Sequence, residues 1–123
     1  MTRLETIIAV KDVAGSSKWY QNLLGCKSSH GGDTFEILTD VDGTVILCLH
    51  RWGDHEHPTM TDPNIAVGNG LILYFRVLDL HEVWNNAVRL NLSVEQEPHV
   101  NENSGQKQFI LRDMDGYYLI VSE

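Results

Sequence analysis

The chain has 123 residues, of which 42% are hydrophobic, and a formal net charge of −8 from nine Lys and Arg against seventeen Asp and Glu. This length allows one modest hydrophobic core, and no apolar run approaches the roughly 20 residues of a membrane span. The acidic balance repels a phosphate backbone, so nucleic acid is not an expected partner, whereas a cationic small molecule is electrostatically tolerated.

The N-terminal half begins with an apolar strand that leads into a helix. Residues 5–10 are mostly apolar, and Asp12 is a typical helix N-cap. Apolar residues then recur at helical spacing until Gly25, which is typical of a helix end. After a further strand, Asp40-Val-Asp-Gly43 lies between two apolar runs and predicts a β-hairpin.

The C-terminal half repeats this pattern in two registers. The segment 5–12 lies over 72–79 at an offset of 67, and Asp40-Val-Asp-Gly43 lies over Asp113-Met-Asp-Gly116 at an offset of 73. A longer loop at 95–106 than near Ser29 would absorb the difference. We predict a single α+β domain over 1–123, made of two βαβββ modules at about 1–60 and 65–123, joined by the polar stretch 53–70.

Several of these motifs resemble the vicinal oxygen chelate superfamily, which includes glyoxalase I, bleomycin-resistance proteins, fosfomycin-resistance enzymes and ring-cleaving dioxygenases. The resemblance rests on the strand into Val10-x-Asp12, the helix end Trp19-Tyr-Gln-Asn-Leu-Leu-Gly25, and Asp113-Met-Asp-Gly-Tyr117, where Met114 replaces the family's usual Pro. Residues 45–53 also resemble the fourth strand of glyoxalase I. The resemblance implies two modules whose curved mixed sheets surround a cleft for a small molecule, and homodimers are common in this architecture.

Many members of the superfamily hold a divalent metal at four strand positions, which correspond here to Glu5, Leu47, Ile72 and Ile120. The repeat supports this correspondence, because offset 67 pairs 5 with 72 and offset 73 pairs 47 with 120. Three of the four side chains are hydrocarbon and offer no donor atom to a metal. We therefore predict neither a metal nor another cofactor in the cleft.

Alternation along the strands predicts which other side chains face the cleft, with the opposite faces covered by the helices. The predicted ligand-binding residues are Glu5, Leu47, Leu49, Trp52, Ile72, Tyr74, Arg76, Tyr118 and Ile120. A site of apolar walls with a few polar groups suits a small molecule, although the same composition also suits a packed core.

Two charged residues carry alternative interpretations. Glu5 among apolar neighbours would have a raised pKa and act as a catalytic general base, or it is a strand-end carboxylate that reaches solvent. Arg76 binds an acidic group of a ligand or pairs with a nearby acid.

The stretch from His50 to Pro58 contains His50, His55 and His57 beside two acids, which raises the question of a metal site. We expect the side chains of His55 and His57 to point apart, and the spacing matches no His-Glu-x-x-His motif. We therefore predict a solvated or cleft-capping loop without metal.

Cys26 and Cys48 are too few for a disulfide framework, and the first residues lack the pattern of a signal peptide, so we expect a cytoplasmic protein. The favoured function is metal-free binding of a small cationic or aromatic molecule, as in bleomycin-resistance proteins. The alternatives are a lyase, isomerase or dioxygenase that uses Glu5 as base or an unconventional metal site, and a scaffold with a filled core. Whether modules pair within or across chains stays open.

Overall fold

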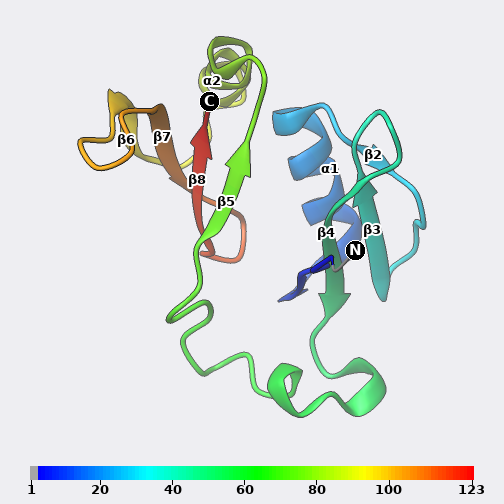
Figure 1. Cartoon of the computed structure of the whole chain (residues 1–123). Coiled ribbons are helices and arrows are strands. Elements are labelled where there is room, and N and C mark those ends of the chain that lie inside the picture. Colours follow the sequence, from blue (N-terminus) through cyan, green and yellow to red (C-terminus); the bar gives the residue numbers. More distant parts are fainter. Residues whose placement is uncertain (1–2) are drawn as a thin grey trace. The chain divides into compact units, whose positions relative to one another are not determined.

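The computed structural model describes residues 3–123. The chain divides into two compact units, here called unit 1, which ends at Ala66, and unit 2, which begins at Val67. Each unit contains one four-stranded mixed sheet and one α-helix, in the order β-α-β-β-β (Figure 1). The predicted α+β class with two βαβββ modules is confirmed.

Unit 1 is built from β1 (Ile7–Val10), α1 (Val13–Leu24), β2 (Lys27–Ser28), β3 (Phe35–Thr39) and β4 (Val45–Arg51). Its strands lie in the order β1-β4-β3-β2. β1 runs parallel to β4, whereas the other neighbouring pairs are antiparallel. The parallel pair forms because α1 carries the chain back across the sheet between β1 and the later strands.

Unit 2 repeats this arrangement with β5 (Leu73–Arg76), α2 (Leu80–Arg89), β6 (Val94–Val100), β7 (Lys107–Arg112) and β8 (Tyr118–Ser122). Its sheet order is β5-β8-β7-β6, with β5 parallel to β8. The two sheets are therefore topologically equivalent, strand for strand.

The predicted caps and turns lie where the sequence places them. Asp12 accepts a hydrogen bond from the N–H of Gly15 at 3.0 Å, and Asp79 accepts one from the N–H of Glu82 at 3.1 Å. Gly25 ends α1 in the left-handed conformation, with φ 73°. Each Asp oxygen satisfies one of the backbone N–H groups that a helix start leaves without a partner.

The extra residues of unit 2 lie largely within 95–106, where they are predicted, but most of them do not form a loop. Residues 94–100 form β6, whose counterpart β2 contains only two residues. The pairing of β6 with β7 has two register shifts, between Val94 and Gln96 and between Gln96 and His99. Most of the extra residues therefore extend an irregular edge strand.

A β-bulge in unit 1 changes the register of β4 relative to β8. Thr39 pairs with Val45 but Leu38 pairs with Leu47, so Ile46 is an extra residue in β4. The matching hairpin of unit 2 has no such residue, because Arg112 pairs with Tyr118 and Leu111 with Leu119. Since side chains alternate along a strand, one extra residue moves every later side chain of β4 to the other face.

The helix of each unit is held on its sheet in a different way. In unit 1 the buried Glu36 of β3 accepts a hydrogen bond from the hydroxyl of Ser17 on α1 at 3.0 Å and another from Ser28 at 2.7 Å. In unit 2 the rings of Trp84 and Phe109 lie 5.2 Å apart, edge to face. One contact is a charge-assisted hydrogen bond and the other is apolar packing.

Candidate functional site

The sheet face turned away from α2 in unit 2 brings five predicted ligand-binding residues together. Tyr74 of β5 pairs with Ile120 of β8, and Arg76 pairs with Ser122. Ile72 precedes β5 and is 55% exposed, while Tyr74 is 45% exposed. The alternate residues Leu73 and Phe75 are buried on the helix side. Large apolar side chains are thus exposed on this face of β5.

Arginine side chains lie against the two tyrosines of this face. The guanidinium of Arg76 lies 5.7 Å from the ring centroid of Tyr74, and that of Arg112 lies 4.9 Å from the ring of Tyr118. Arg76 also donates to the carbonyl oxygen of Glu123 at 2.7 Å. No Asp or Glu side chain forms an ion pair with Arg76 among residues 3–123. Of the two interpretations of Arg76, pairing with an acidic side chain is therefore not observed among these residues.

Sequence reasoning missed the residues of β7 that complete this face. Arg112 forms an ion pair with Glu95 at 2.6 Å and donates to the carbonyl oxygen of Gly116 at 2.9 Å. Gln108 lies opposite Ser122, and its side-chain nitrogen is 3.3 Å from Nε2 of His99. The pairing of β7 with β8 would have identified Arg112, because it lies in register with the predicted Tyr118. The face therefore has an aromatic centre with polar groups at its ends.

In unit 1, the bulge at Ile46 overturns the predicted orientation of β4. Leu47 and Leu49 are 1% and 0% exposed, and Leu49 pairs with Glu36, whose carboxylate contacts α1. Both leucines therefore belong to the core beneath α1. The prediction that they share a face with Ile7 and Ala9 is wrong, because Cys48 and His50 occupy that face instead.

Glu5 lies ahead of β1 and does not have the apolar surroundings that were predicted for it. Its side chain is 43% exposed and forms an ion pair with Arg3 at 2.9 Å. The alternative enzyme, in which burial activates Glu5 as a base, loses the environment on which it depended. Trp52 follows β4 and is half-buried, with its backbone N–H 3.4 Å from the carbonyl oxygen of Val10.

The corrected register also changes the four positions at which members of the superfamily hold a metal. The counterpart of Ile120 is Cys48 rather than Leu47, because Cys48 pairs with Ile7 as Ile120 pairs with Tyr74. Ile72 and Ile120 still contribute only hydrocarbon, and Glu5 is occupied by Arg3. These residues do not fit a divalent metal, which requires three or more oxygen, nitrogen or sulfur donors.

Both cysteines are free and buried. Burial raises the pKa of the Cys26 thiol to about 11. Burial, together with the negative charge of Glu5, also raises the pKa of Cys48. Since the thiolate is the reactive form, neither cysteine is a candidate nucleophile.

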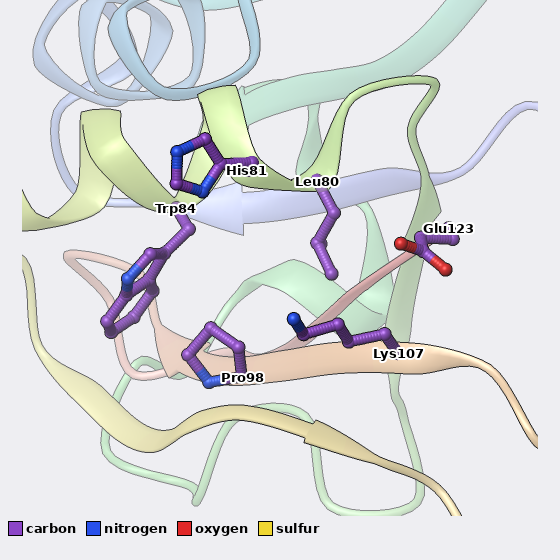
Figure 2. A pocket seen from close by; sticks show the side chains of 6 residues that line it. All are labelled: Leu80, His81, Trp84, Pro98, Lys107 and Glu123. Carbon is purple, nitrogen blue, oxygen red and sulfur yellow. The ribbon is translucent and has the colours of Figure 1, made fainter.

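A pocket of about 310 Å³ lies between α2 and the sheet of unit 2. Figure 2 shows the side chains of Leu80 and Trp84 descending from α2 toward Pro98 and Lys107 on the sheet. His81 and Glu123 complete the lining. None of the predicted site residues lines this pocket, and its volume is at the lower end of the range for ligand sites.

The loop after β4 brings three histidines together, contrary to the prediction that His55 and His57 point apart. Their ring nitrogens and that of His50 lie within 4.8 Å of one another. The prediction was wrong because residues two apart share one side of an extended strand. The backbone here is also not extended, since residues 54–56 form a 3₁₀ turn in which His55 has φ 62°. Glu5 and a histidine do not form such a group anywhere in residues 3–123.

No helix within the described part of the chain is long and apolar enough to cross a membrane.

The whole chain is similar in fold to several solved structures. A bleomycin resistance determinant encoded on the transposon Tn5 matches with a TM-score of 0.72 and 18% identity, covering 100% of this chain and 98% of that one.

Two further structures match over nearly the same length. A glyoxalase/bleomycin resistance protein/dioxygenase family enzyme from Burkholderia phytofirmans PsJN has a TM-score of 0.77 and 15% identity, and the match covers 96% of this chain and 94% of that one. TioX from Micromonospora sp. ML1 has a TM-score of 0.70 and 15% identity, with 98% of each chain covered. Residues 3–121 match the family model of the Glyoxalase/Bleomycin resistance protein/Dioxygenase superfamily. The chain therefore belongs to the glyoxalase/bleomycin resistance protein/dioxygenase superfamily.

Proposed function

We propose that the protein binds a small planar aromatic molecule, cationic or neutral, on the exposed sheet face of unit 2, without a metal at the superfamily's four strand positions. The observation that carries this proposal is the exposure of Ile72 and Tyr74, at 55% and 45%, beside the half-buried Tyr118 and Ile120. A contiguous exposed apolar face is typical of a binding surface. The donor set at the four strand positions supports the metal-free part of the proposal.

The aromatic character of the ligand follows from the two tyrosines. The neighbouring guanidinium groups, 5.7 Å and 4.9 Å from the rings of Tyr74 and Tyr118, restrict the motion of those rings. Restricted rings lose less conformational entropy when a ligand stacks on them. Offset or edge-to-face contact with each ring would contribute about 0.5–1.5 kcal/mol beyond the area buried.

Two opposing electrostatic effects, the net charge of the chain and the local charge of Arg76, bear on the charge of the ligand. The net charge of −8 attracts cations at long range. Locally, Glu95 neutralises Arg112, whereas Arg76 has no Asp or Glu side-chain partner among residues 3–123 and repels a cation placed directly beside it. A ligand whose aromatic ring lies over the tyrosines, with any cationic group turned away from Arg76, keeps the long-range attraction and avoids the local repulsion. An anionic aromatic ligand that binds Arg76 is the competing outcome.

Calorimetric titration with size-matched cationic, neutral and anionic aromatic compounds tests the proposal. We expect a cationic or neutral member to bind, and Tyr74→Ala or Tyr118→Ala to weaken it by about tenfold, the equivalent of one lost aromatic contact. Val100→Ala is the matched control, because Val100 is 61% exposed on β6 of the same unit. Absent binding, or wild-type affinity in both tyrosine variants, would contradict the proposal.

We also propose a homodimer in the cytoplasm. An exposed apolar sheet face is stabilised when a second surface covers it, and buried free thiols suit a reducing compartment. Size-exclusion chromatography with light scattering, performed with and without the bound aromatic compound, tests the dimer. A monomer under both conditions would exclude it.

A further inference from the structure

In unit 1, one histidine of β4 and two histidines of the turn that follows it place their ring nitrogens within 4.8 Å of one another. His50 is the sixth residue of β4 and is 3% exposed, whereas His55 and His57 are exposed. The ring centroids of His50 and His57 are 5.0 Å apart, and those of His50 and His55 are 5.2 Å apart. We propose that His50, His55 and His57 form a binding site for a single divalent transition metal, with zinc as its reference ion.

The hydrogen bonds of His50 fix which of its nitrogens is free to bind. Nδ1 lies 2.7 Å from the carbonyl oxygen of Arg51. Because a carbonyl only accepts, Nδ1 carries the proton and Nε2 has the lone pair. Nε2 is directed at the other histidines and lies 3.1 Å from Nδ1 of His55. A second nitrogen bonded to a backbone carbonyl is the usual arrangement of a metal-binding histidine.

The distances suit a tetrahedral ion. Two nitrogens bound to zinc at about 2.0–2.1 Å in tetrahedral geometry lie about 3.3 Å apart. The pair His50 and His55 is already at 3.1 Å, and all three ligand atoms lie within 4.8 Å of one another. Small side-chain rotations of the two exposed histidines close the remaining gap without movement of the buried one.

The backbone of the turn is fixed independently of the histidines. The N–H of Gly53 donates to the carbonyl oxygen of Met60 at 2.7 Å, which closes the turn. Arg51 donates to the carboxylate of Asp54 at 2.6 Å. His55 adopts φ 62°, a left-handed conformation that is uncommon outside glycine. Such a conformation persists where the surroundings determine it.

The donor set limits the identity of the ion. Three neutral imidazoles suit zinc, copper, nickel or iron, whereas magnesium and calcium require oxygen ligands. Three protein ligands leave a fourth tetrahedral position, which faces solvent because His55 and His57 are exposed. The site is separate from the four strand positions of the superfamily, and it does not depend on the aromatic face of unit 2.

The test uses the full chain, purified without a polyhistidine tag and stripped of metal with a chelator. Titration with cobalt(II), followed by visible absorption, reports coordination directly, because tetrahedral cobalt absorbs far more strongly than octahedral cobalt. We expect one equivalent to bind with a tetrahedral spectrum, and zinc to displace it. His55→Asn and His57→Asn should each weaken cobalt binding by at least about 100-fold.

His81→Asn is the matched control, because His81 is exposed on α2 in unit 2 and should leave the affinity unchanged. Both test positions are exposed, so the variants are expected to fold, and circular dichroism confirms this before titration. An octahedral spectrum, several weak equivalents, or affinity retained in either variant would overturn the three-histidine site.

Discussion

The two units have the same order of elements, but they present different chemistry on the sheet face away from the helix. In unit 2 that face is aromatic and apolar, with Tyr74 and Ile120 paired at its centre. In unit 1 the equivalent positions are Ile7 and Cys48, followed by Ala9 and His50. A single extra residue, Ile46, accounts for the assignment of Cys48 and His50 to this face. One bulge can therefore change which side chains a duplicated unit presents on one face of its sheet.

The units also differ in what attaches the helix to the sheet, and this contrast predicts the largest effect. Phe109 is 0% exposed and packs against Trp84, so Phe109→Ala leaves a cavity beneath α2. We expect a loss of about 3–5 kcal/mol in the free energy of unfolding, measured by urea denaturation. Val100→Ala on the neighbouring strand should change it by less than about 0.5 kcal/mol. Similar values for the two variants would contradict an apolar attachment of α2.

In unit 1 a hydrogen bond to a charged carboxylate adds to the apolar packing of α1, and Glu36→Gln removes that charge while keeping the shape of the side chain. The carboxylate also accepts from the N–H groups of Gly31 at 2.8 Å and Ile37 at 2.9 Å. We expect a loss of about 2 kcal/mol in urea denaturation at pH 7, as for hydrogen bonds to a charged group. Glu97→Gln, at an exposed position, is the control. An unchanged denaturation midpoint would show that the charge of Glu36 does not stabilise α1 on its sheet.

The same carboxylate gives unit 1 a dependence on pH. Burial acts to raise the pKa of Glu36, but hydrogen bonds from Gly31, Ser28, Ser17 and Ile37 outweigh it and hold the pKa below its ordinary value. A lowered pKa in the folded state contributes stability above the unfolded pKa of about 4.3, and this contribution is lost as the pH falls through the folded pKa. The stability difference between wild type and Glu36→Gln should therefore shrink as the pH falls from 6 toward about 3. A difference independent of pH would contradict the ionised, hydrogen-bonded carboxylate.

The helix starts are the feature that the units share, and they should respond alike. Asp12→Ala and Asp79→Ala each remove one side-chain hydrogen bond to a backbone N–H, at 3.0 Å and 3.1 Å respectively. We expect each to lower the free energy of unfolding by about 1 kcal/mol. Asp12→Asn and Asp79→Asn keep an accepting oxygen and should lose less. A large inequality between the two units would show that the caps are not equivalent.

The features that sequence reasoning predicted correctly are local ones. Asp12, Asp79 and Gly25 are identified by backbone requirements at helix ends, and Asp40 to Gly43 by the turn between two strands. Each depends on a few neighbouring residues, so a short pattern is sufficient.

The features that were mispredicted depend on register and on backbone turns. The bulge at Ile46 is one residue long and leaves no signal in an apolar run such as Val45 to Leu49, so Leu47 was assigned to the wrong face. The left-handed conformation of His55 likewise cannot be recognised from a His-x-His spacing. Glu5 is partly exposed and pairs with Arg3, and strand alternation predicts neither feature.

The face containing Tyr74, Tyr118 and Ile120 is proposed to bind a small aromatic molecule. A ¹H–¹⁵N NMR titration with an aromatic compound selected by calorimetry tests this claim at residue level, because each backbone amide reports on its own surroundings. We expect the largest shift changes at residues 72–76 and 118–122. Shift changes confined to Leu80, Trp84 and Pro98 would place the ligand in the pocket beside α2 and contradict the claim.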